Sequence, residues 1–545
     1  MARSSDPAFR GSRPFRPAAR GDRRLGAPSP SVPNQPDPPP ERFNAARHLL
    51  AGNTARRGEK PALILVGEGG RETRYSFAEI DRSVRSLAAG LLDLGLAPGS
   101  RVMIRMGNEP AYLLVYFAAL AAGLIAMPSS PQLTPAEASF LMEDSGAAAV
   151  ALGAGQAVEP DHAAGRVVLR PDDIARMLRT EPLPDYADTA AADPAYLIYT
   201  SGTTSRPKGV LHAHRAIWGR RPMHDHWLGL TEGDIVLHAG TMNWTYTLGV
   251  GIMDPWARGA TAVLYNGPRD PGVWPRLIET QRATLFAAVP SVFRQLLKYA
   301  DLGRQDLSSL RHGVTAGEAL SATLLEEWQE ATGKPLYEAL GMSEISTYIS
   351  SGPTVPVKPG SPGKPQPGRH VAILPVEGDP APLPAGETGL LAVHRSDPGL
   401  MLGYWNRPEE EAAIFRGEWF VGGDLAEFDD DGYLWFHGRA DDVMNAFGYR
   451  VSPGEVESVL IQHPAVHEVA VAEIAVRDDI RVIAAFIVPE PGTNPSKTEL
   501  DSHCAGRLAP YKQPREYRIV EALPRTPNGK VQRKRLAAAS GRPAG

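Results

Sequence analysis

The chain has 545 residues, more than a single hydrophobic core usually serves, so we expect two or more domains. Apolar residues make up 43% and charged residues 22%, and the net charge of −5 excludes a global basic field for binding nucleic acid. The single cysteine, Cys504, excludes an internal disulfide and a cysteine metal cluster, so we expect a reducing, cytoplasmic compartment.

Residues 1–40 differ in kind from the rest of the chain. They hold ten prolines, seven arginines and three acidic residues. Such a stretch buries too little apolar area to offset the entropy of ordering it, so we predict a disordered tail. The tail lacks the apolar core of a secretory signal, and its arginines resemble a transit peptide only weakly.

The segment 110–136 contains no charged side chain, and its apolar part approaches the length of a membrane span. Gly123, Pro128 and Pro131 interrupt it, and Arg101–Met106 just before it has the pattern of a strand. We therefore expect a strand, a buried helix and a second strand of a parallel sheet, and no integral membrane segment.

Short apolar runs alternate with helical patterns from about residue 44 to 435. This alternation predicts α/β layers with parallel sheets. Between about 355 and 400 the chain is rich in Pro and Gly, which indicates a small β subdomain. The expected strands are Val102–Met106, Ala195–Tyr199, Ala260–Tyr265, Thr284–Val289 and Gly313–Ala316, and the expected helices are Ser291–Ala300 and Leu324–Thr332.

The pattern changes after Gly438. Ser452-Pro453-Gly454-Glu455 is a capping box with proline at the first helical position, and the strand-like runs Glu468–Val476 and Arg481–Val488 follow. We predict a compact α+β domain of about a hundred residues here. The predicted boundaries are 1–40 for the tail, 41–439 for the large domain and 440–545 for the small domain.

The strongest motif runs from Tyr199 to Gly209, where an apolar strand enters a loop of hydroxyls and glycines that ends in Pro-Lys-Gly. Glycines let the backbone approach a ligand, hydroxyls donate to anions, and Arg206 and Lys208 add positive charge. This composition predicts a polyphosphate cradle, although the spacing of the nucleoside-triphosphatase loop is absent. The residues expected to bind phosphate are Thr200, Ser201, Gly202, Thr203 and Thr204.

This segment resembles the phosphate loop of the adenylate-forming superfamily, which comprises acyl-CoA synthetases, luciferases and the adenylation domains of peptide synthetases. The resemblance covers about residues 44–540. It implies an α/β fold: a large N-terminal domain of layered subdomains plus a small β subdomain, and a smaller mobile α+β C-terminal domain. It also implies ATP, Mg²⁺ and coenzyme A as cofactors and a small-molecule carboxylic acid as substrate.

Gly341-Met342-Ser343-Glu344 is similar to the family's Gly-x-Thr-Glu motif. The resemblance implies that Ser343 contacts phosphate and that Glu344 holds Mg²⁺, a hard cation that prefers carboxylate and phosphate oxygens together. The family usually has an aromatic residue before this glycine, where this chain has Leu340, so adenine would pack on an aliphatic face.

Three further nucleotide contacts and a hinge follow from the resemblance. Thr315–Ala319 is similar to a segment whose backbone lines the adenine and acyl pockets, and Gly423-Asp424 to one whose carboxylate accepts the ribose hydroxyls. Arg439 is implied near ribose and phosphate, and Asp441 as the hinge of the small domain. The nucleotide-binding set therefore includes Gly317, Glu318, Ala339, Leu340, Gly341, Asp424 and Arg439.

The small domain carries two more motifs. Gly448, Tyr449 and Arg450 match the family segment beside which pantetheine passes, and Pro524–Lys530 matches the catalytic lysine loop. Pro, Asn and Gly form a tight turn that presents Lys530 at its tip. The implied catalytic residues are Lys530, Lys208 and Glu344.

The implied reaction has two steps. The substrate carboxylate attacks the α-phosphate of ATP and pyrophosphate leaves, which needs two anions positioned and their charge cancelled. The small domain then swings about Asp441, removes Lys530 and brings in Gly448 with the thiol.

The acyl pocket is expected around Trp244, Tyr246 and Ala316, although the two aromatic residues are equally consistent with a packed core. Phe43–Ala46 with Leu340 and Ser343-Glu344 resembles the benzoate-CoA ligase branch, whereas Met253–Ala260 resembles medium-chain acyl-CoA synthetases. Aromatic and short- or medium-chain aliphatic acids both remain open.

Two alternatives to a CoA ligase stay open at this point. One is adenylation with transfer to the phosphopantetheine of a carrier protein, against which the chain's end soon after Lys530 argues modestly. The other is a catalytically dead nucleotide-binding protein, against which the presence of Lys208, Glu344, Asp424 and Lys530 argues. The protein could be a monomer or a homodimer.

Overall fold

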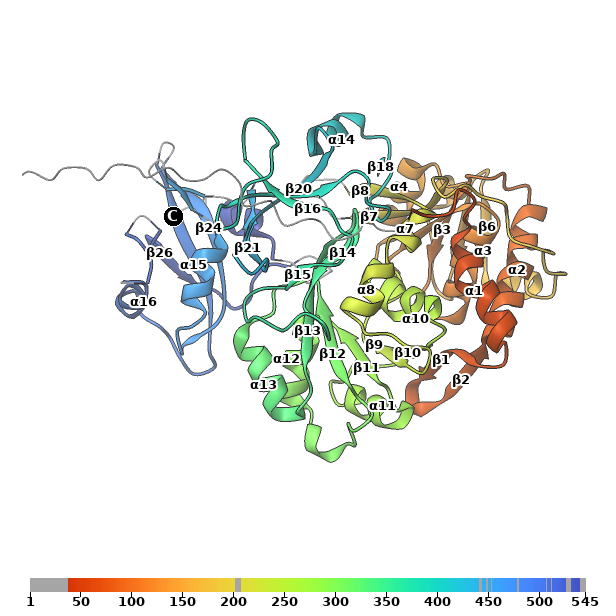
Figure 1. Ribbon diagram of the computed structural model, residues 1–545, viewed down its shortest axis with the longest axis horizontal. Coiled ribbons are helices and arrows are strands. Elements are labelled where there is room, and N and C mark those ends of the chain that lie inside the picture. The colour runs from red at the N-terminus through yellow and green to blue at the C-terminus, as the bar shows by residue number, and fades with distance from the viewer. Residues whose placement is uncertain are drawn as a thin grey trace, which may run out of the picture.

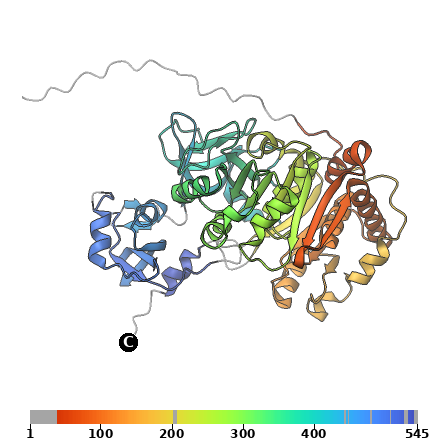
Figure 2. The same cartoon turned by 90° about the horizontal axis from the view of Figure 1, so that it is seen from below.

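A computed structural model of the protein describes residues 38–200, 207–440, 444–446, 449–451, 453–477, 480–505, 507–510, 512–525 and 531–539. A large layered region is followed by a smaller α+β unit set to one side of it, as both views show (Figure 1, Figure 2). Residues 1–37, most of the tail predicted to be disordered, lie outside the described residues.

A seven-stranded sheet carries the strand that leads into the phosphate loop. Its order is β18-β8-β7-β4-β3-β5-β6. Its strands are β3 (Arg101–Arg105), β4 (Ile125–Ser129), β5 (Ala149–Leu152), β6 (Val167–Leu169), β7 (Pro194–Thr200), β8 (Lys208–Ala213) and β18 (Gly403–Tyr404).

A nine-stranded sheet carries the Gly-x-Ser-Glu segment. Its order is β15-β14-β13-β12-β11-β9-β10-β1-β2. Its strands are β1 (Pro61–Gly67), β2 (Glu72–Ser76), β9 (Ile235–His238), β10 (Thr261–Asn266), β11 (Leu285–Ala288), β12 (His312–Ala316), β13 (Leu336–Met342), β14 (Ser346–Ser350) and β15 (Lys364–Pro365).

Helices form layers on and between these two sheets. One core cluster joins residues of both sheets through α1, α2, α3 and α10. The helices α11, α12 and α13 cover the far face of the nine-stranded sheet, and α4 covers the far face of the seven-stranded sheet. The helices are α1 (Ala45–Arg57), α2 (Phe77–Asp93), α3 (Pro110–Ala121), α4 (Pro135–Ser145), α5 (Pro160–Ala163), α6 (Pro171–Met177), α7 (Arg215–Trp218), α8 (Arg221–His226), α9 (Thr245–Leu248), α10 (Asp254–Ala257), α11 (Val273–Gln281), α12 (Pro290–Tyr299), α13 (Ala322–Thr332) and α14 (Pro408–Ile414), with short turns η1 (Glu68–Gly70), η2 (Gly249–Met253) and η3 (Leu302–Arg304).

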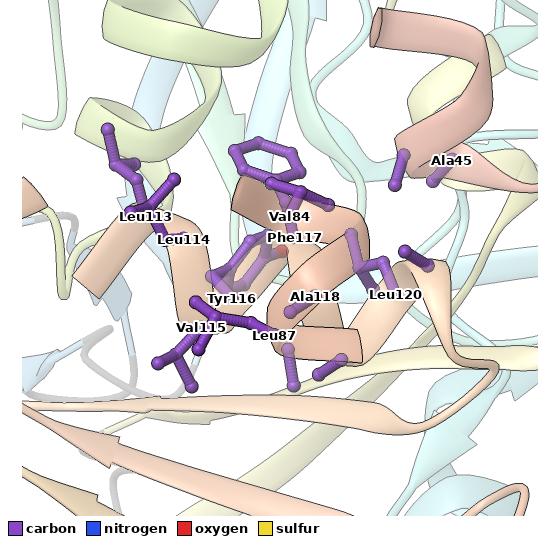
Figure 3. Packing of buried hydrophobic residues seen from close by; sticks show 14 of the residues in the cluster. Ala45, Val84, Leu87, Leu113, Leu114, Val115, Tyr116, Phe117, Ala118 and Leu120 are labelled. Atoms are coloured by element: carbon purple, nitrogen blue, oxygen red, sulfur yellow. The ribbon is translucent and has the colours of Figure 1, made fainter. Parts of the chain in front are cut away.

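The uncharged segment 110–136 folds as expected, into the buried helix α3 and the strand β4, which lies parallel to β3. Its side chains, among them Tyr116, Phe117 and Leu120, pack against Val84 and Leu87 of α2 (Figure 3). Within the described part of the chain, no helix has the length and apolar character needed to cross a bilayer.

An antiparallel sheet forms the predicted β subdomain and reaches further along the chain than residue 400. Its strands are β16 (Val371–Leu374), β17 (Gly389–His394), β19 (Phe415–Arg416), β20 (Trp419–Phe428) and β21 (Leu434–Arg439). The small unit comprises β22 (Met444–Ala446), β23 (Tyr449–Val451), α15 (Pro453–Leu460), β24 (Val466–Arg477), β25 (Ile480–Pro489), α16 (Lys497–Cys504), β26 (Glu516–Ile519) and α17 (Arg533–Ala539).

The expected elements are confirmed with shifts of one or two residues at their ends, and Gly333 ends α13 in the left-handed conformation. Most neighbouring strands of the two large sheets are parallel, as expected, but each sheet also contains antiparallel pairs. β7 pairs with β8, and β13 with β14, in antiparallel register. Both pairs are joined by connections too short for a crossover, and a short connection can only return the chain antiparallel to itself.

Candidate active site

The predicted phosphate loop connects β7 and β8, which pair in antiparallel register. Thr200 ends β7 and pairs directly with Lys208, the first residue of β8. This register fixes both ends of the loop on the sheet. The other predicted phosphate ligands, Ser201, Gly202, Thr203 and Thr204, lie outside the described residues, as does Arg206.

Lys208 is held between an acidic helix and an aromatic ring. Its ammonium forms an ion pair with the carboxylate of Glu410 on α14 and lies 5.5 Å from the centre of the Tyr404 ring. The Lys208 side chain is 20% exposed and that of Glu410 is 36% exposed, so solvent screens this pair only in part. The phosphate loop therefore ends beside residues that lie about two hundred positions later in the chain.

Tyr404 links Lys208 to Glu344. Its hydroxyl donates a hydrogen bond of 2.7 Å to Glu344 Oε1. Burial and then the neighbouring Glu344 charge raise the pKa of Tyr404 well above its ordinary value, so the hydroxyl stays protonated and acts as a donor. Lys208 and Glu344, predicted from separate motifs, thus belong to one cluster.

Glu344 occupies the tight turn between β13 and β14. Its backbone carbonyl accepts a hydrogen bond of 2.8 Å from Met401 N. The motif's Gly341 and Met342 are part of β13, and Gly341 pairs with Thr347. A Cβ on Gly341 would lie 2.5 Å from the Ser346 carbonyl oxygen, so this close approach of two backbones requires glycine.

Asp424 and Arg439 face each other across β20 and β21. Arg439 Nη1 lies 3.3 Å from Asp424 Oδ1 and donates a hydrogen bond of 2.7 Å to the Gly422 carbonyl. Burial first, and then the charges of Asp424 and Glu344, raise the pKa of the buried Tyr348 hydroxyl. The predicted ribose and magnesium carboxylates therefore both act on this side chain.

The predicted adenine-binding residues lie at the ends of two adjacent parallel strands. Ala316 ends β12 and pairs with Ala339 of β13, and Gly317 follows with a φ of +95°, a conformation that favours glycine. Glu318 forms an ion pair of 3.2 Å with Arg294, and Leu340 is partly buried against a hydrophobic cluster of the β subdomain.

The predicted acyl-pocket residues meet in one hydrophobic cluster. The Trp244 and Tyr246 rings lie edge to face with their centres 5.6 Å apart, and Ala316 belongs to the same cluster. Tyr246 is buried and its hydroxyl donates to the Val314 carbonyl at 3.3 Å. The outer ring of Trp244 lies 3.6 Å from the position of a Cβ on Gly317, so the tryptophan borders the expected adenine segment.

Most residues predicted to act from the small domain lie outside the part of the chain that the structure describes. These are Lys530, Asp441 and Gly448, together with the side chains of Tyr449 and Arg450. The ends of the lysine loop are described. Arg525 forms an antiparallel bridge with Val531, and Gln532 N donates 2.8 Å to the Pro524 carbonyl. Arg525 also pairs with Glu468 of β24 at 2.8 Å, which ties the base of the loop to the sheet.

Sequence reasoning missed several residues of the cluster, chiefly Tyr404 and Glu410. A signal was present, because Gly403–Arg407 is a turn with two aromatic residues and a run of acidic residues at a helix start follows it. It also missed Glu338, which precedes the predicted adenine segment. Burial raises the pKa of Glu338 to about 7, and its carboxylate accepts a hydrogen bond of 3.0 Å from Leu320 N.

The donors at Glu344 fit Mg²⁺ shared with a nucleotide. Among the residues that the structure describes, no three His, Cys, Asp or Glu side chains gather as a protein-only metal site. Mg²⁺ usually takes one or two carboxylates and completes its shell with water and substrate phosphates. A single carboxylate beside the phosphate-loop lysine matches this pattern.

Comparisons with known proteins agree with this geometry. The family model described as AMP-binding enzyme matches residues 50–405, and that described as AMP-binding enzyme C-terminal domain matches residues 455–530. The 3-hydroxybenzoate–CoA ligase of Aromatoleum sp. (strain CIB) is 31% identical over 511 residues, which cover 91% of this chain and 96% of that protein. The mitochondrial acyl-coenzyme A synthetase ACSM5 of Homo sapiens is 34% identical over 538 residues, which cover 91% and 90%. The crystal structure of the anthranilate CoA ligase AuaEII in complex with anthranoyl-AMP superposes with a TM-score of 0.82 at 30% identity, covering 92% of this chain and 98% of that one.

Proposed function

The chain belongs to the AMP-binding enzyme family, and from this premise we propose how its residues divide the work of the reaction. It is an ATP-dependent acid–thiol ligase that joins a carboxylic acid to coenzyme A through an acyl adenylate, releases AMP and pyrophosphate, and uses Mg²⁺. Its relatives are CoA ligases, so they favour neither a carrier-protein acceptor nor a dead nucleotide-binding protein.

One observation supports the assignment of roles above all others: the contacts that run from Lys208 through Tyr404 to Glu344. Asp424 and Arg439 form a separate pair on β20 and β21. In this assignment Lys208 and the hydroxyls of the phosphate loop bind the phosphates of ATP. Glu344 ligates Mg²⁺, and Asp424 accepts hydrogen bonds from the ribose. Adenine lies against the ends of β12 and β13, where Gly317 and Leu340 stand.

Adenylation requires two anions to approach each other, so charge compensation and alignment are its main demands. The substrate carboxylate attacks the α-phosphorus, the bond from that phosphorus to the bridging oxygen breaks, and the electron pair leaves with pyrophosphate. Mg²⁺ bound with ATP neutralises phosphate charge. Lys208 and Lys530 supply the remaining positive charge, with Lys530 beside the carboxylate and Lys208 beside the leaving group.

Thioester formation uses the small domain in a second orientation. We place the domain boundary at 439/440, so that Asp441 is the hinge and Gly448 and Lys530 move together. The pantetheine thiol attacks the acyl carbonyl past Gly448, where a missing side chain permits close approach. The carbon–oxygen bond to AMP breaks, and the thiol proton leaves with solvent.

We propose an aromatic acid as the preferred substrate class. In this assignment a flat substrate ring packs on the partly buried Trp244, which lies beside Gly317 and has the buried Tyr246 edge to face behind it. The 3-hydroxybenzoate and anthranilate ligases among the similar proteins have aromatic acids in their names, which supports this class over an aliphatic chain. A cytoplasmic location and a monomer or homodimer remain predictions.

The test is acid-dependent release of pyrophosphate. Purified protein is given MgATP with benzoates or C2–C10 fatty acids, and pyrophosphate is measured before coenzyme A is added. We expect pyrophosphate release only with an acid, faster for the aromatic series, and a CoA thioester only after CoA is added. Release that is independent of added acid would contradict the reaction. Faster turnover of a fatty acid than of every benzoate would contradict the aromatic class alone.

A further inference from the structure

The turn that presents Glu344 is closed by a residue in a strained conformation. Met342 of β13 pairs with Ser346 of β14, so Ser343, Glu344 and Ile345 form the connecting loop. Ser346 has a φ of +77°, and it is one of three non-glycine residues with a positive φ in the described part of the chain. Hairpin turns usually place glycine at such a position, because a Cβ is unfavourable there. Contacts from outside the turn must therefore hold Ser346 in place.

Arg220 supplies such a contact. Its Nη1 donates a hydrogen bond to the Ser346 hydroxyl oxygen. Arg220 is 6% exposed and lies between α7 and α8, 126 residues before Ser346 in the chain. Because a guanidinium can only donate, Ser346 Oγ accepts this bond, and the contact fixes the orientation of the serine side chain.

Arg220 is itself held by several contacts. Its Nε and Nη2 donate to the two Asp254 carboxylate oxygens at 2.8 and 2.6 Å, and the same carboxylate lies 3.1 Å from His224 Nε2. Asp254 is fully buried at the start of α10. A Cβ on Gly249 would lie 2.1 Å from Arg220 Nη2, so the guanidinium packs directly against the backbone of η2. A planar group fixed by two parallel hydrogen bonds directs its remaining nitrogen one way, toward Ser346.

The beginning of the turn is anchored through its backbone. The Ser343 carbonyl oxygen lies 2.8 Å from His212 Nε2 of β8, and the Glu344 carbonyl accepts a hydrogen bond of 2.8 Å from Met401 N. These two contacts fix the beginning of the turn, and the contact with Arg220 fixes its end. The Glu344 carboxylate therefore projects from a turn that is held on both sides of it.

We propose that Arg220 is a positioning residue of the magnesium site: through Ser346 it sets the backbone of the turn, and the turn sets the direction of the Glu344 carboxylate. The inference rests on the proposed role of Glu344 as a ligand of Mg²⁺ in the acid–CoA ligase reaction. Replacing a residue that orients a metal ligand typically lowers metal affinity by roughly 10- to 100-fold. Arg220 acts without touching the metal or ATP, because its guanidinium is occupied by Asp254 and Ser346.

The first test measures binding rather than turnover. ATP binding to the full chain, without acid or CoA, is measured by calorimetry with excess Mg²⁺ and again with EDTA. Ser346→Ala removes the hydroxyl that Arg220 holds. We expect its Kd for MgATP to rise by roughly 10-fold and its Kd for metal-free ATP to stay within about 2-fold of wild type, because only the metal contact is misdirected.

Ser350→Ala is the matched control for loss of a serine hydroxyl. Ser350 lies on the same strand, β14, and is 1% exposed. Its hydroxyl oxygen accepts a hydrogen bond of 3.3 Å from Gln366 Nε2, away from the turn. Both Kd values should stay at those of wild type in this variant.

Ser346→Gly separates the hydroxyl from the backbone conformation. Glycine adopts a positive φ readily, so this variant relieves the strain but lacks the contact with Arg220. We expect it to lose affinity for MgATP as Ser346→Ala does. Wild-type affinity for MgATP in Ser346→Gly would mean that the turn needs only its backbone conformation, and would overturn the role of Arg220.

The second test connects the effect to Arg220 itself. Arg220→Lys keeps a positive charge opposite Asp254 but lacks the planar fork that also reaches Ser346. It should weaken MgATP binding about as much as Ser346→Ala, and the double variant should bind no more weakly than either single variant, because both changes remove one contact. Additive losses would contradict the inference. If Arg220→Lys does not fold, the two Ser346 variants decide.

The outcomes distinguish this inference from the reaction on which it rests. If wild type forms a CoA thioester and Ser346→Ala binds MgATP as tightly as wild type, the ligase stands and the positioning role is wrong. If Ser346→Ala weakens ATP binding equally with Mg²⁺ and with EDTA, the hydroxyl supports the nucleotide site as a whole, and the inference is again wrong. If wild type binds ATP equally well with and without Mg²⁺, the role of Glu344 fails and the inference fails with it.

Discussion

The Tyr404 hydroxyl donates a hydrogen bond of 2.7 Å to the Glu344 carboxylate, across sixty positions of sequence. It orients the carboxylate that we assign to Mg²⁺, and the Tyr404 ring stands beside the ammonium of Lys208. Tyr404 therefore contacts two motif residues, Lys208 and Glu344, that belong to different sheets. Removing its hydroxyl tests whether the two residues act together.

Tyr404→Phe keeps the ring and removes only the hydroxyl. A hydrogen bond to a charged group contributes about 1.5–3 kcal/mol, so we expect kcat/KM for MgATP to fall by roughly 10- to 100-fold and the Mg²⁺ concentration for half-maximal rate to rise. Initial rates across a magnesium series measure both. Tyr433→Phe is the control, because its hydroxyl bonds the Pro356 carbonyl at 2.9 Å outside the cluster. Equal magnesium dependence in the two variants would contradict the role of Tyr404.

Glu410→Gln should lower the KM for ATP. In the structure Lys208 is ion-paired with Glu410, so phosphate must compete with this carboxylate. A partly exposed ion pair contributes about 0.2–1 kcal/mol, which predicts a decrease of up to about 5-fold. Initial rates at varied ATP give the KM. Glu409→Gln, at the exposed neighbouring position of the same helix, is the control and should leave KM unchanged. A higher KM in Glu410→Gln would instead mean that Glu410 assists binding.

Asp254→Asn should destabilise the large domain. The variant leaves the Arg220 guanidinium buried without its counter-charge, and breaking a buried ion pair from one side costs about 3–5 kcal/mol. Urea unfolding followed by tryptophan fluorescence measures the change. Asp301→Asn, which removes an exposed pair with Arg304, should change the stability by less than about 0.5 kcal/mol. Similar unfolding midpoints for the two variants would refute the importance of the buried pair.

Lys530→Ala should separate the two half-reactions. Adenylation, followed by pyrophosphate release, should fall by about 100-fold or more because charge compensation in the transition state is lost. Formation of the thioester from supplied acyl adenylate and CoA should persist at near the wild-type rate. The exposed Lys497 of α16 gives a control substitution in the same domain. An equal loss in both half-reactions would show that the loop acts structurally.

Glu338→Gln should alter the pH dependence of stability. Burial raises the pKa of Glu338 from 4.5 to about 7, so the folded chain holds this proton more tightly than the unfolded chain. As the pH rises, ionisation of this carboxyl therefore stabilises the unfolded state more than the folded state. The contribution of Glu338 to the free energy of unfolding falls between pH 4.5 and about pH 7 and is constant above that range. Unfolding midpoints are measured for Glu338→Gln and wild type at about pH 5 and about pH 8. The two proteins should have similar midpoints at the lower pH, and the variant should be the more stable at the higher pH. Glu326→Gln, on the exposed face of α13, should run parallel to wild type.

The sequence alone predicted the elements that depend on local pattern. The apolar runs 195–199 and 313–316 form β7 and β12, because a run of apolar residues favours a buried strand. Gly333 ends α13, because glycine readily adopts the left-handed conformation. It predicted Lys208, Glu344 and Asp424 because each stands in a motif. It could not predict that Tyr404 joins the first two, since that contact depends on β18 pairing with β8 across the chain.

The antiparallel pairs within the two large sheets were also beyond the sequence. Alternating strands and helices suggest parallel sheets, yet the hairpins at β7–β8 and β13–β14 come from short connections whose reversal a hydrophobic pattern does not record.

The ion pairs of the cluster affect which anions the protein binds weakly. Lys208 already has Glu410, and Arg439 already has Asp424. A bare inorganic anion such as phosphate or sulfate would have to displace a carboxylate and would gain no additional ion pair. A nucleotide that arrives with its own divalent cation brings charges of both signs. Its cation can bind the Glu344 carboxylate while its phosphates form an ion pair with Lys208. Abundant cellular salts should therefore be poor competitors of ATP at the loop that we propose as its phosphate site.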